Sequence, residues 1–168
     1  DSDRSDWYDF LAGQGVVYSD TGNPVSDTPI DASDLNVPSL AIGELFGTQT
    51  VKRTLTAVDG GGTWTASVEG ASGLDVSVSP ASFTVANAQA QDVQITVAAG
   101  SAAPGEWAAA HIVWTSSDGQ TVRMPVVAQP GVADAPDLIE GHTTDETLDL
   151  PVLSGVNGTL ETLSLIHI

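Results

Sequence analysis

The stretch GEWAAAHIVWTSSDGQTVRMPVVAQP, from Gly105 to Pro130, predicts two β-strands joined by a tight turn. Small polar residues and a glycine, Ser116-Ser117-Asp118-Gly119, separate the arms, as in hairpin turns that need a residue at positive φ. In each arm, apolar side chains recur at every second position and so share one face; these are Ala110, Ile112, Trp114, Val122, Met124 and Val126. A single hairpin is only marginally stable in water, so this apolar face requires a second sheet.

The residues from about Asp34 onward contain the strands that can supply this sheet. Short alternating apolar runs bounded by Gly, Pro, Asn and Asp are typical of an all-β chain. Arg53 interrupts the apolar face of one run, and we expect its charged head to reach solvent at the end of the sheet. The runs lie around residues 40–42, 48–58, 63–68, 74–78, 83–85 and 93–97. With the hairpin they make seven or eight strands, spaced as in an immunoglobulin-like or fibronectin type III-like β-sandwich.

The residues before the sandwich predict a short helix and a linker. Residues 5–13 form the expected helix, with Ser5 as its cap and Gly13 as its end. Its apolar stripe consists of Trp7, Phe10 and Leu11. A helix of only two turns cannot bury such a stripe by itself. We therefore expect it to dock on another part of the protein, upstream of this chain. Residues 21–33 are rich in Pro, Asp, Ser and Thr and predict an irregular linker.

After Pro130 the strand pattern weakens. Residues 131–136 predict a linker, and Leu148, Leu150 and Val152 predict one strand of a further, truncated domain. The apolar run 163–168 resembles translated adapter sequence and is given no structural role. The expected organisation is the end of a preceding domain with its linker at 1–33, the sandwich at 34–130, and a linker with the start of another domain at 131–168.

The net charge of −18 arises from 22 acidic residues against four Lys and Arg. It argues against nucleic acid and against an anionic membrane surface as partners, because both require basic residues. An acidic, well-solvated surface explains the charge, with calcium binding or an extracellular, salty medium as the alternative. No apolar run reaches the ~18 residues that a membrane span needs. The chain has no cysteine, which excludes disulfides and thiol catalysis.

No catalytic, cofactor-binding or metal-binding residue is predicted. There is no Gly-x-Ser-x-Gly segment for a nucleophile. We expect His111 on the outer face of a strand, His142 in an acidic loop and His167 in the terminal run, none of them as a base or a ligand. The run Asp1–Asp6 is weakly similar to a calcium loop, but Asp6 and Ala12 stand where that loop needs Gly and Glu.

Two further patterns concern carbohydrate. The tripeptide Asn157-Gly158-Thr159 fits a glycosylation acceptor, a pattern that is common by chance. Three tryptophans, Trp64, Trp107 and Trp114, could form a sugar-binding platform. Alternation instead places Trp114 in the core, and we expect Trp107 to be the most exposed of the three.

Two segments resemble the start of the C-terminal fibronectin type III-like domain of subtilisin-like serine proteases (subtilases): Asp34-Leu35-Asn36-Val37-Pro38-Ser39-Leu40 and Thr50-Val51-Lys52-Arg53-Thr54-Leu55-Thr56. Residues 65–68, residues 76–80 and the opening hairpin resemble its later strands. Residues 6–11 with Gly13 are similar to the short helix that ends the protease domain in this family. The resemblance covers residues 5 to 129, and Ala12 departs from it, because many relatives have a cysteine there.

The resemblance implies a C-terminal fragment of a secreted, bacterial serine endopeptidase that acts on proteins or peptides through an Asp-His-Ser triad. The family's Gly-Thr-Ser-Met-Ala nucleophile segment is absent, so we expect this chain to be inactive alone. Its role would be to pack against the protease domain and to support stability or substrate access. The alternative is a free-standing extracellular module that binds carbohydrate or protein.

Overall fold

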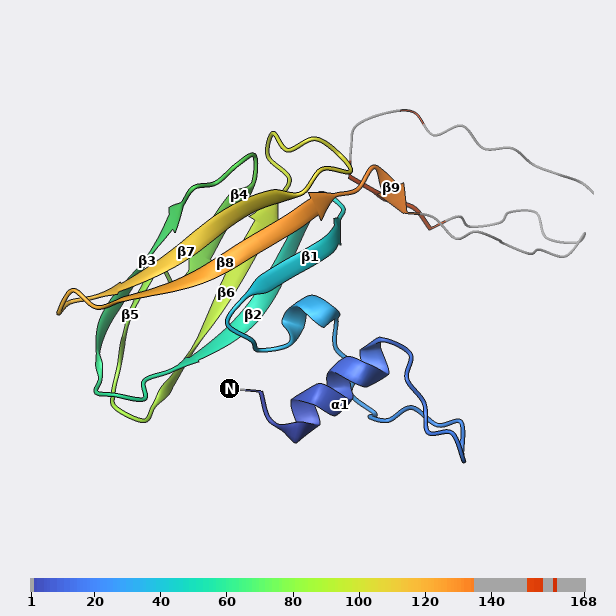
Figure 1. Cartoon of the computed structure of the whole chain (residues 1–168), viewed down its shortest axis with the longest axis horizontal. Coiled ribbons are helices and arrows are strands. Elements are labelled where there is room, and N and C mark those ends of the chain that lie inside the picture. Colours follow the sequence, from blue (N-terminus) through green and yellow to red (C-terminus); the bar gives the residue numbers. More distant parts are fainter. Residues whose placement is uncertain (1, 135–150, 156–158, 160–168) are drawn as a thin grey trace, which may run out of the picture.

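Two β-sheets packed face to face make up the main body of the protein (Figure 1). The structure is a computed structural model that describes residues 2–134, 151–155 and 159. One sheet has five strands in the order β1-β8-β7-β3-β5, and the other has three in the order β2-β6-β4. The predicted all-β sandwich of the fibronectin or immunoglobulin type is therefore confirmed.

The strands follow the alternating runs of the sequence closely. The five-stranded sheet consists of β1 (Leu40–Leu45), β3 (Gly62–Glu69), β5 (Ser82–Val85), β7 (Ala108–Ser116) and β8 (Thr121–Pro130). The three-stranded sheet consists of β2 (Thr48–Thr56), β4 (Asp75–Ser79) and β6 (Ala90–Ala98). Neighbouring strands are antiparallel, except that β1 runs parallel to β8.

The hairpin of β7 and β8 has the predicted turn. Gly119 adopts a positive φ of 84°, and its N–H donates to the Ser116 carbonyl oxygen at 3.0 Å. One expectation for the hairpin is wrong: Val122 is 54% exposed although it pairs with the buried Trp114. The reason is that β1 pairs with β8 only from Val126 onward, so β8 has no neighbouring strand on that side at Val122, close to the hairpin turn.

The core lies between the sheets and draws on both of them. Full burial of an aliphatic side chain contributes about 1.5–3 kcal/mol. The largest fully buried side chains are Leu40, Leu45, Val51, Val93, Ile95, Val97, Ile112 and Val126. They come from β1, β2, β6, β7 and β8. The apolar face of the hairpin therefore packs against the second sheet, as predicted.

Arg53 was expected in solvent and is instead buried, with 2% of its surface exposed. It lies on the inward face of β2, between Val51 and Leu55 in the alternation. The guanidinium stays inside because it donates to two backbone carbonyl oxygens, those of Lys52 (2.9 Å) and Ser39 (3.1 Å).

The N-terminal helix α1 (Arg4–Gly13) begins earlier than predicted. Asp3 caps it in place of Ser5: Asp3 Oδ1 accepts from the N–H groups of Ser5 (2.7 Å) and Asp6 (3.2 Å), and Asp6 Oδ2 accepts from the Asp3 N–H (2.8 Å). This reciprocal capping box satisfies more free N–H groups than a serine cap does. Gly13 is the last helical residue, as expected. The linker contains one element that was not predicted, the 3₁₀ turn η1 (Ala32–Asp34).

Beyond Pro130, the structure describes one short antiparallel pair. Strand β9 (Ala133–Asp134) pairs with β10 (Leu153–Ser154). Val152, from the strand predicted over Leu148, Leu150 and Val152, precedes β10 and is not part of it, while Leu148 and Leu150 lie outside the described residues. The predictions for His142, Asn157, His167 and the run 163–168 also lie outside them. Among the described helices, none has the length and apolar character to cross a membrane.

The packing of the sheets predicts a large cost for a cavity at the centre of β6. Ile95 is fully buried and pairs with both Val51 and Val78. Ile95→Ala should lower the free energy of unfolding by about 2–5 kcal/mol. Val58→Ala is the matched control, because Val58 is 86% exposed and its truncation should change stability by no more than about 0.5 kcal/mol. Urea unfolding measures both; similar costs at the two positions would contradict the described core.

Candidate functional site

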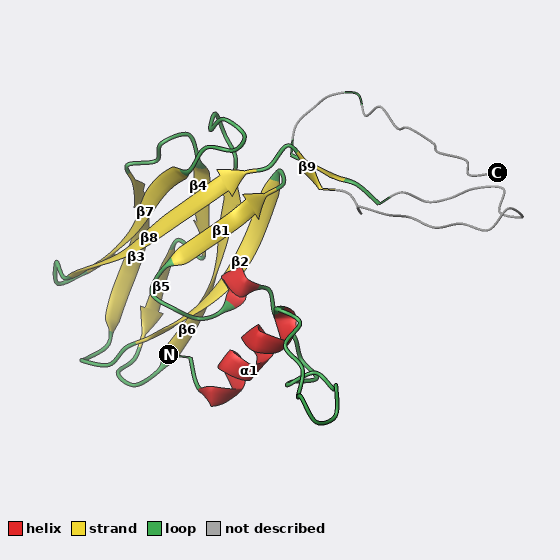
Figure 2. Ribbon diagram, turned by 45° about the vertical axis from the view of Figure 1, so that its right-hand side comes forward, coloured by secondary structure: helices red, strands yellow, loops and turns green. Residues whose placement is uncertain are grey.

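The N-terminal arm (residues 2–36) is joined to the β2 edge of the sandwich, and this junction is the candidate functional site. Figures 1 and 2 place α1 beside η1, near β1 and β2. Asp9 anchors the helix to the returning linker: its Oδ1 accepts from the hydroxyls of Ser26 and Thr28 (2.7 Å for Thr28), and its carbonyl oxygen accepts from the Ile30 N–H at 3.1 Å. The arm is thus ordered by polar contacts between α1 and residues 26–30.

Gly13 allows the linker to pass close to the end of α1. A Cβ atom at this position would lie 1.9 Å from the Ile30 carbonyl oxygen, far inside van der Waals contact. Only glycine fits there without displacing the linker. The residue that sequence reasoning assigned to helix termination therefore also sets the path of the chain toward the sandwich.

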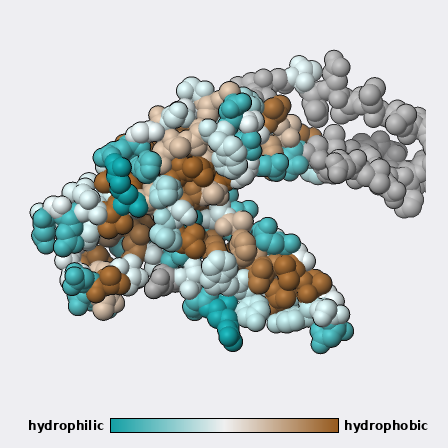
Figure 3. Space-filling model, viewed as in Figure 1, coloured by the Kyte–Doolittle hydropathy of each residue, from teal (hydrophilic) through white to brown (hydrophobic). Residues whose placement is uncertain are grey.

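The helix does not use its apolar stripe to hold this position. None of its residues is buried, and Trp7 is 47% exposed. Trp7 and Phe10 contact each other edge to face, with ring centroids 5.8 Å apart. Exposed apolar residues gather on this arm (Figure 3), and we call them the aromatic face: Trp7, Tyr8, Leu11, Val16, Val17 and Tyr18. Exposed apolar residues that gather on one segment in this way are typical of an interaction site.

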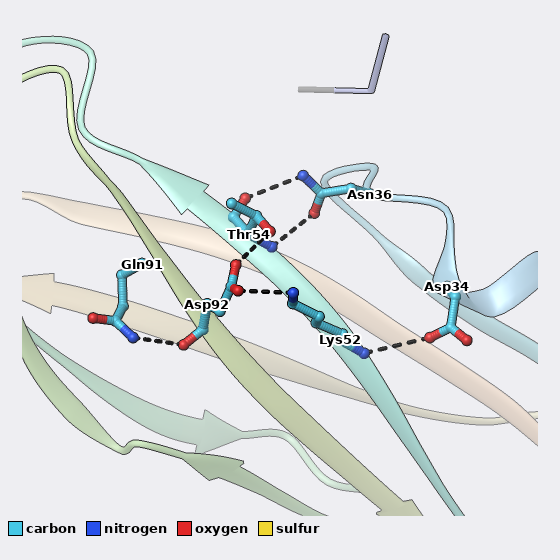
Figure 4. A network of polar contacts seen from close by, with 6 residues as sticks. All are labelled: Asp34, Asn36, Lys52, Thr54, Gln91 and Asp92. Carbon is cyan, nitrogen blue, oxygen red and sulfur yellow. Dashed lines mark hydrogen bonds and ion pairs between the residues drawn. The ribbon is translucent and has the colours of Figure 1, made fainter. Parts of the chain in front are cut away.

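Asn36 attaches the arm to the free edge of β2. Its Nδ2 donates to the Thr54 carbonyl oxygen at 3.1 Å, and its Oδ1 accepts from the Thr54 N–H at 3.0 Å (Figure 4). Because β2 is an edge strand, its outward backbone groups have no strand partner. The carboxamide of Asn36 supplies both hydrogen bonds that a neighbouring strand would have made.

Two more contacts extend this attachment along β2. Asp34 Oδ1 accepts from the Lys52 N–H at 3.4 Å, and Gln49 Nε2 donates to Ser33 Oγ at 2.8 Å. Leu35, between Asp34 and Asn36, is buried. The arm therefore runs beside β2 with its polar residues on the strand edge. Sequence reasoning singled out Asp34-Leu35-Asn36 only as a family signature; its alternation of polar and buried residues was the available structural signal.

The outer face of β2 is linked to β6 through Asp92. Its carboxylate lies 2.7 Å from Lys52 Nζ and accepts from Thr54 Oγ1 at 2.6 Å (Figure 4). These hydrogen bonds, that of Lys52 first and that of Thr54 second, hold the pKa of Asp92 below its ordinary value. Thr54 thus contacts the arm through its backbone and β6 through its side chain.

Of the residues considered as ligands from sequence, Asp3, Asp6 and His111 lie in the described part of the chain. Asp3 and Asp6 cap α1, and the hydrogen bond from Ser5 is the main cause that lowers the pKa of Asp3. His111 is half-buried in β7, opposite Glu69 and Pro125. In the part of the chain that the structure describes, no group of three His, Cys, Asp or Glu side chains could hold a metal ion.

The three tryptophans do not form one platform. Trp114 is buried and Trp107 is 58% exposed, as predicted. Trp64 pairs with Ser116 at the far end of β7, whereas Trp107 precedes the start of that strand. At ~3.3 Å per residue, the length of β7 separates them by roughly 30 Å. A sugar ring could not contact both.

The attachment by Asn36 predicts a measurable contribution to stability. Asn36→Ala removes both hydrogen bonds to Thr54 and leaves backbone groups of a half-buried edge unpaired, which should cost about 1–3 kcal/mol. Asn23→Ala, in the exposed loop after α1, is the control and should be nearly neutral. Chemical unfolding measures the difference, and hydrogen exchange at the Thr54 amide should accelerate only in the first variant. Unchanged exchange would show that Asn36 does not protect this edge.

Comparison with known proteins gives the same fold. Residues 34–128 match the family model of the fibronectin type-III domain. The chain is 32% identical over 103 residues to Subtilisin-like protease SBT2.3 and 30% identical over 105 residues to Subtilisin-like protease SBT2.2, both of Arabidopsis thaliana. These alignments cover 58% and 59% of this chain but only 12% of each relative.

Among solved structures, the E. coli chaperone DraB is similar, with 14% sequence identity, a TM-score of 0.45, and coverage of 61% of this chain and 57% of that chain. The family match spans more than half of the present chain, and its two curated relatives are proteases. The resemblance found in the sequence is therefore confirmed: the chain belongs to the fibronectin type-III domain family, in the form associated with subtilisin-like proteases.

Proposed function

We propose that this chain is the accessory C-terminal domain of a secreted subtilisin-like serine endopeptidase. The observation that carries the proposal is the exposed aromatic face of the N-terminal arm. In support, both curated relatives are subtilisin-like proteases, and the present chain covers 12% of their length. On this proposal, residues 1–33 end the protease domain and lead to the sandwich at 34–130, while 131–168 begin a further part.

The physical basis of this proposal is that the arm is folded, held by polar contacts, although its helix buries no apolar side chain. A ten-residue helix is marginal in water by itself, and α1 buries none of its residues against the described chain. Docking the aromatic face on a protease domain would supply the missing apolar contact. Tryptophan and tyrosine are the residues that most often dominate such interfaces. Because Asn36 fixes the arm on β2, this docking would also orient the sandwich relative to the protease.

Peptide-bond cleavage then belongs to the parent protein, through the Asp-His-Ser triad that the family resemblance implies. The present chain supports folding, stability or substrate access, and its partner is the protease domain of the same polypeptide. Protein or peptide substrates and an extracellular location follow from that assignment. The source inferred from the resemblance is bacterial, whereas the curated relatives are plant proteins.

A free-standing extracellular binding module is the second candidate, and the exposure of Trp107 favours it. The coding sequence upstream of Asp1 separates the two. Asp, His and Gly-Thr-Ser segments in subtilase order would support the accessory domain. An export signal directly before Asp1 would overturn that proposal and favour the binding module.

The docking role predicts a difference between the isolated chain and the full-length protein. The double change Trp7→Ser with Leu11→Ser should leave the melting temperature of residues 1–168 nearly unchanged, because neither side chain is buried there. In the full-length protease, the same change should lower the melting temperature and shorten the half-life of peptidase activity, because the interface is lost.

Trp107→Ser is the control, since Trp107 is exposed on the sandwich and outside the aromatic face. It should change neither the melting temperature of the isolated chain nor that of the full-length protease. Equal destabilisation of the isolated chain and the full-length protein by the double change would show that the aromatic face packs within this chain, and would refute the docking role.

A further inference from the structure

A pocket of about 400 Å³ opens between the two sheets, at the end where β2 leaves the sandwich and the β7–β8 hairpin turns. Its walls come from both sheets and from residues 36–38, which connect the arm to β1. Aromatic and apolar side chains make up most of the lining, including Trp64, Phe83, Trp114 and Met124. Val122, the exposed valine of the hairpin tip, is also part of the lining.

The charged group in this lining with the deepest burial is the guanidinium of Arg53. Two of its nitrogens donate to the carbonyl oxygens of Lys52 and Ser39, while its Nε–H is buried and has no acceptor. A buried hydrogen-bond donor without a partner is destabilising. Arg53 thus lines the pocket and carries one buried N–H donor that has no partner.

Arg53 also lacks a counter-ion. The ion pairs of the described residues join Lys52 to Asp92 and Arg123 to Glu69, and neither includes Arg53. Burial lowers the pKa of Arg53, and only the more distant charge of Asp34 opposes this effect. A buried charge without an ionic partner is costly, and this one stands in a protein of net charge −18.

These features define the ligand that would fit. Arginine pairs with carboxylates through short, charge-assisted hydrogen bonds. The aromatic walls suit an apolar body, and pockets of ~300–1,000 Å³ hold small organic ligands. Asp59, an exposed carboxylate of the lining, disfavours a ligand with more than one negative charge.

We propose that this pocket binds an amphipathic monocarboxylate, with its apolar body against Trp64, Phe83 and Trp114 and its carboxylate beside Arg53. The site is independent of the proposed accessory role, because all of its walls belong to the present chain. The same chemistry is offered by a free aromatic acid and by a peptide that ends in an aromatic residue.

The test uses residues 1–168 and three probes: 3-phenylpropionate, its uncharged analogue 3-phenylpropanamide, and a short peptide with a C-terminal phenylalanine. Calorimetry and tryptophan fluorescence report binding, since Trp64 and Trp114 line the pocket. At least one carboxylate probe should bind saturably. 3-Phenylpropionate should bind at least about tenfold more tightly than its amide, the ratio expected for a hydrogen bond to a charged group. The tighter of the two carboxylate probes identifies the source of the ligand.

Three variants locate the site. Arg53→Met should remove the preference for acid over amide. Val122→Phe, at an exposed position, should fill the pocket and weaken all probes without lowering the melting temperature. Arg123→Met is the matched control, because Arg123 is exposed, pairs with Glu69 and lies outside the lining; it should change nothing.

Arg53→Met also removes the two hydrogen bonds to backbone carbonyls, so it could unfold the sandwich. In that case two measurements test the proposal without it: the ratio of the affinities of the unchanged chain for acid and amide, and the binding of the probes to Val122→Phe. Equal binding of acid and amide, no saturable binding of any probe, or undiminished binding by Val122→Phe would each overturn the proposal.

Discussion

The apolar contact between the two sheets is the interaction on which the other features depend. Strands β7 and β8 contribute a side chain to it at every second position, and β2 and β6 contribute the facing layer. Burial of apolar area is non-directional, so it selects the sandwich but not its details. Those details arise where the alternation of a strand puts a polar residue on the inner face, or where a strand extends beyond its partner.

Arg53 shows the first of these consequences. Its place between Val51 and Leu55 directs it inward, because a shift by one residue would turn the whole apolar face of β2 to solvent. Two backbone carbonyl oxygens offset part of the cost of burying the charge. Arg53 also lines a pocket whose wall is mostly apolar, and its buried Nε–H has no hydrogen-bond partner.

The edge of β2 shows how the sandwich handles unpaired backbone. An exposed edge strand invites pairing with other chains, and here the arm covers it through side-chain contacts instead of a further strand. Asn36 makes two hydrogen bonds to one residue of β2, which fixes the position of the arm without burying α1. The aromatic face is left uncovered by the described chain, and the proposed docking to a protease domain follows from this combination.

The sequence by itself determined the strands, the β7–β8 turn, the burial of Trp114 and the exposure of Trp107. These features depend on local alternation and on glycine at positive φ, both of which neighbouring residues set. Only the tertiary structure decided that Arg53 is buried, that Val122 is exposed and that Asn36 pairs with Thr54. Each of these outcomes depends on segments distant in sequence: Ser39 is 14 residues from Arg53, and Thr54 is 18 residues from Asn36. The helix cap lies at Asp3, because Asp3 and Asp6 each accept a hydrogen bond from the other's backbone N–H, a reciprocal pair that the single hydroxyl of Ser5 cannot make.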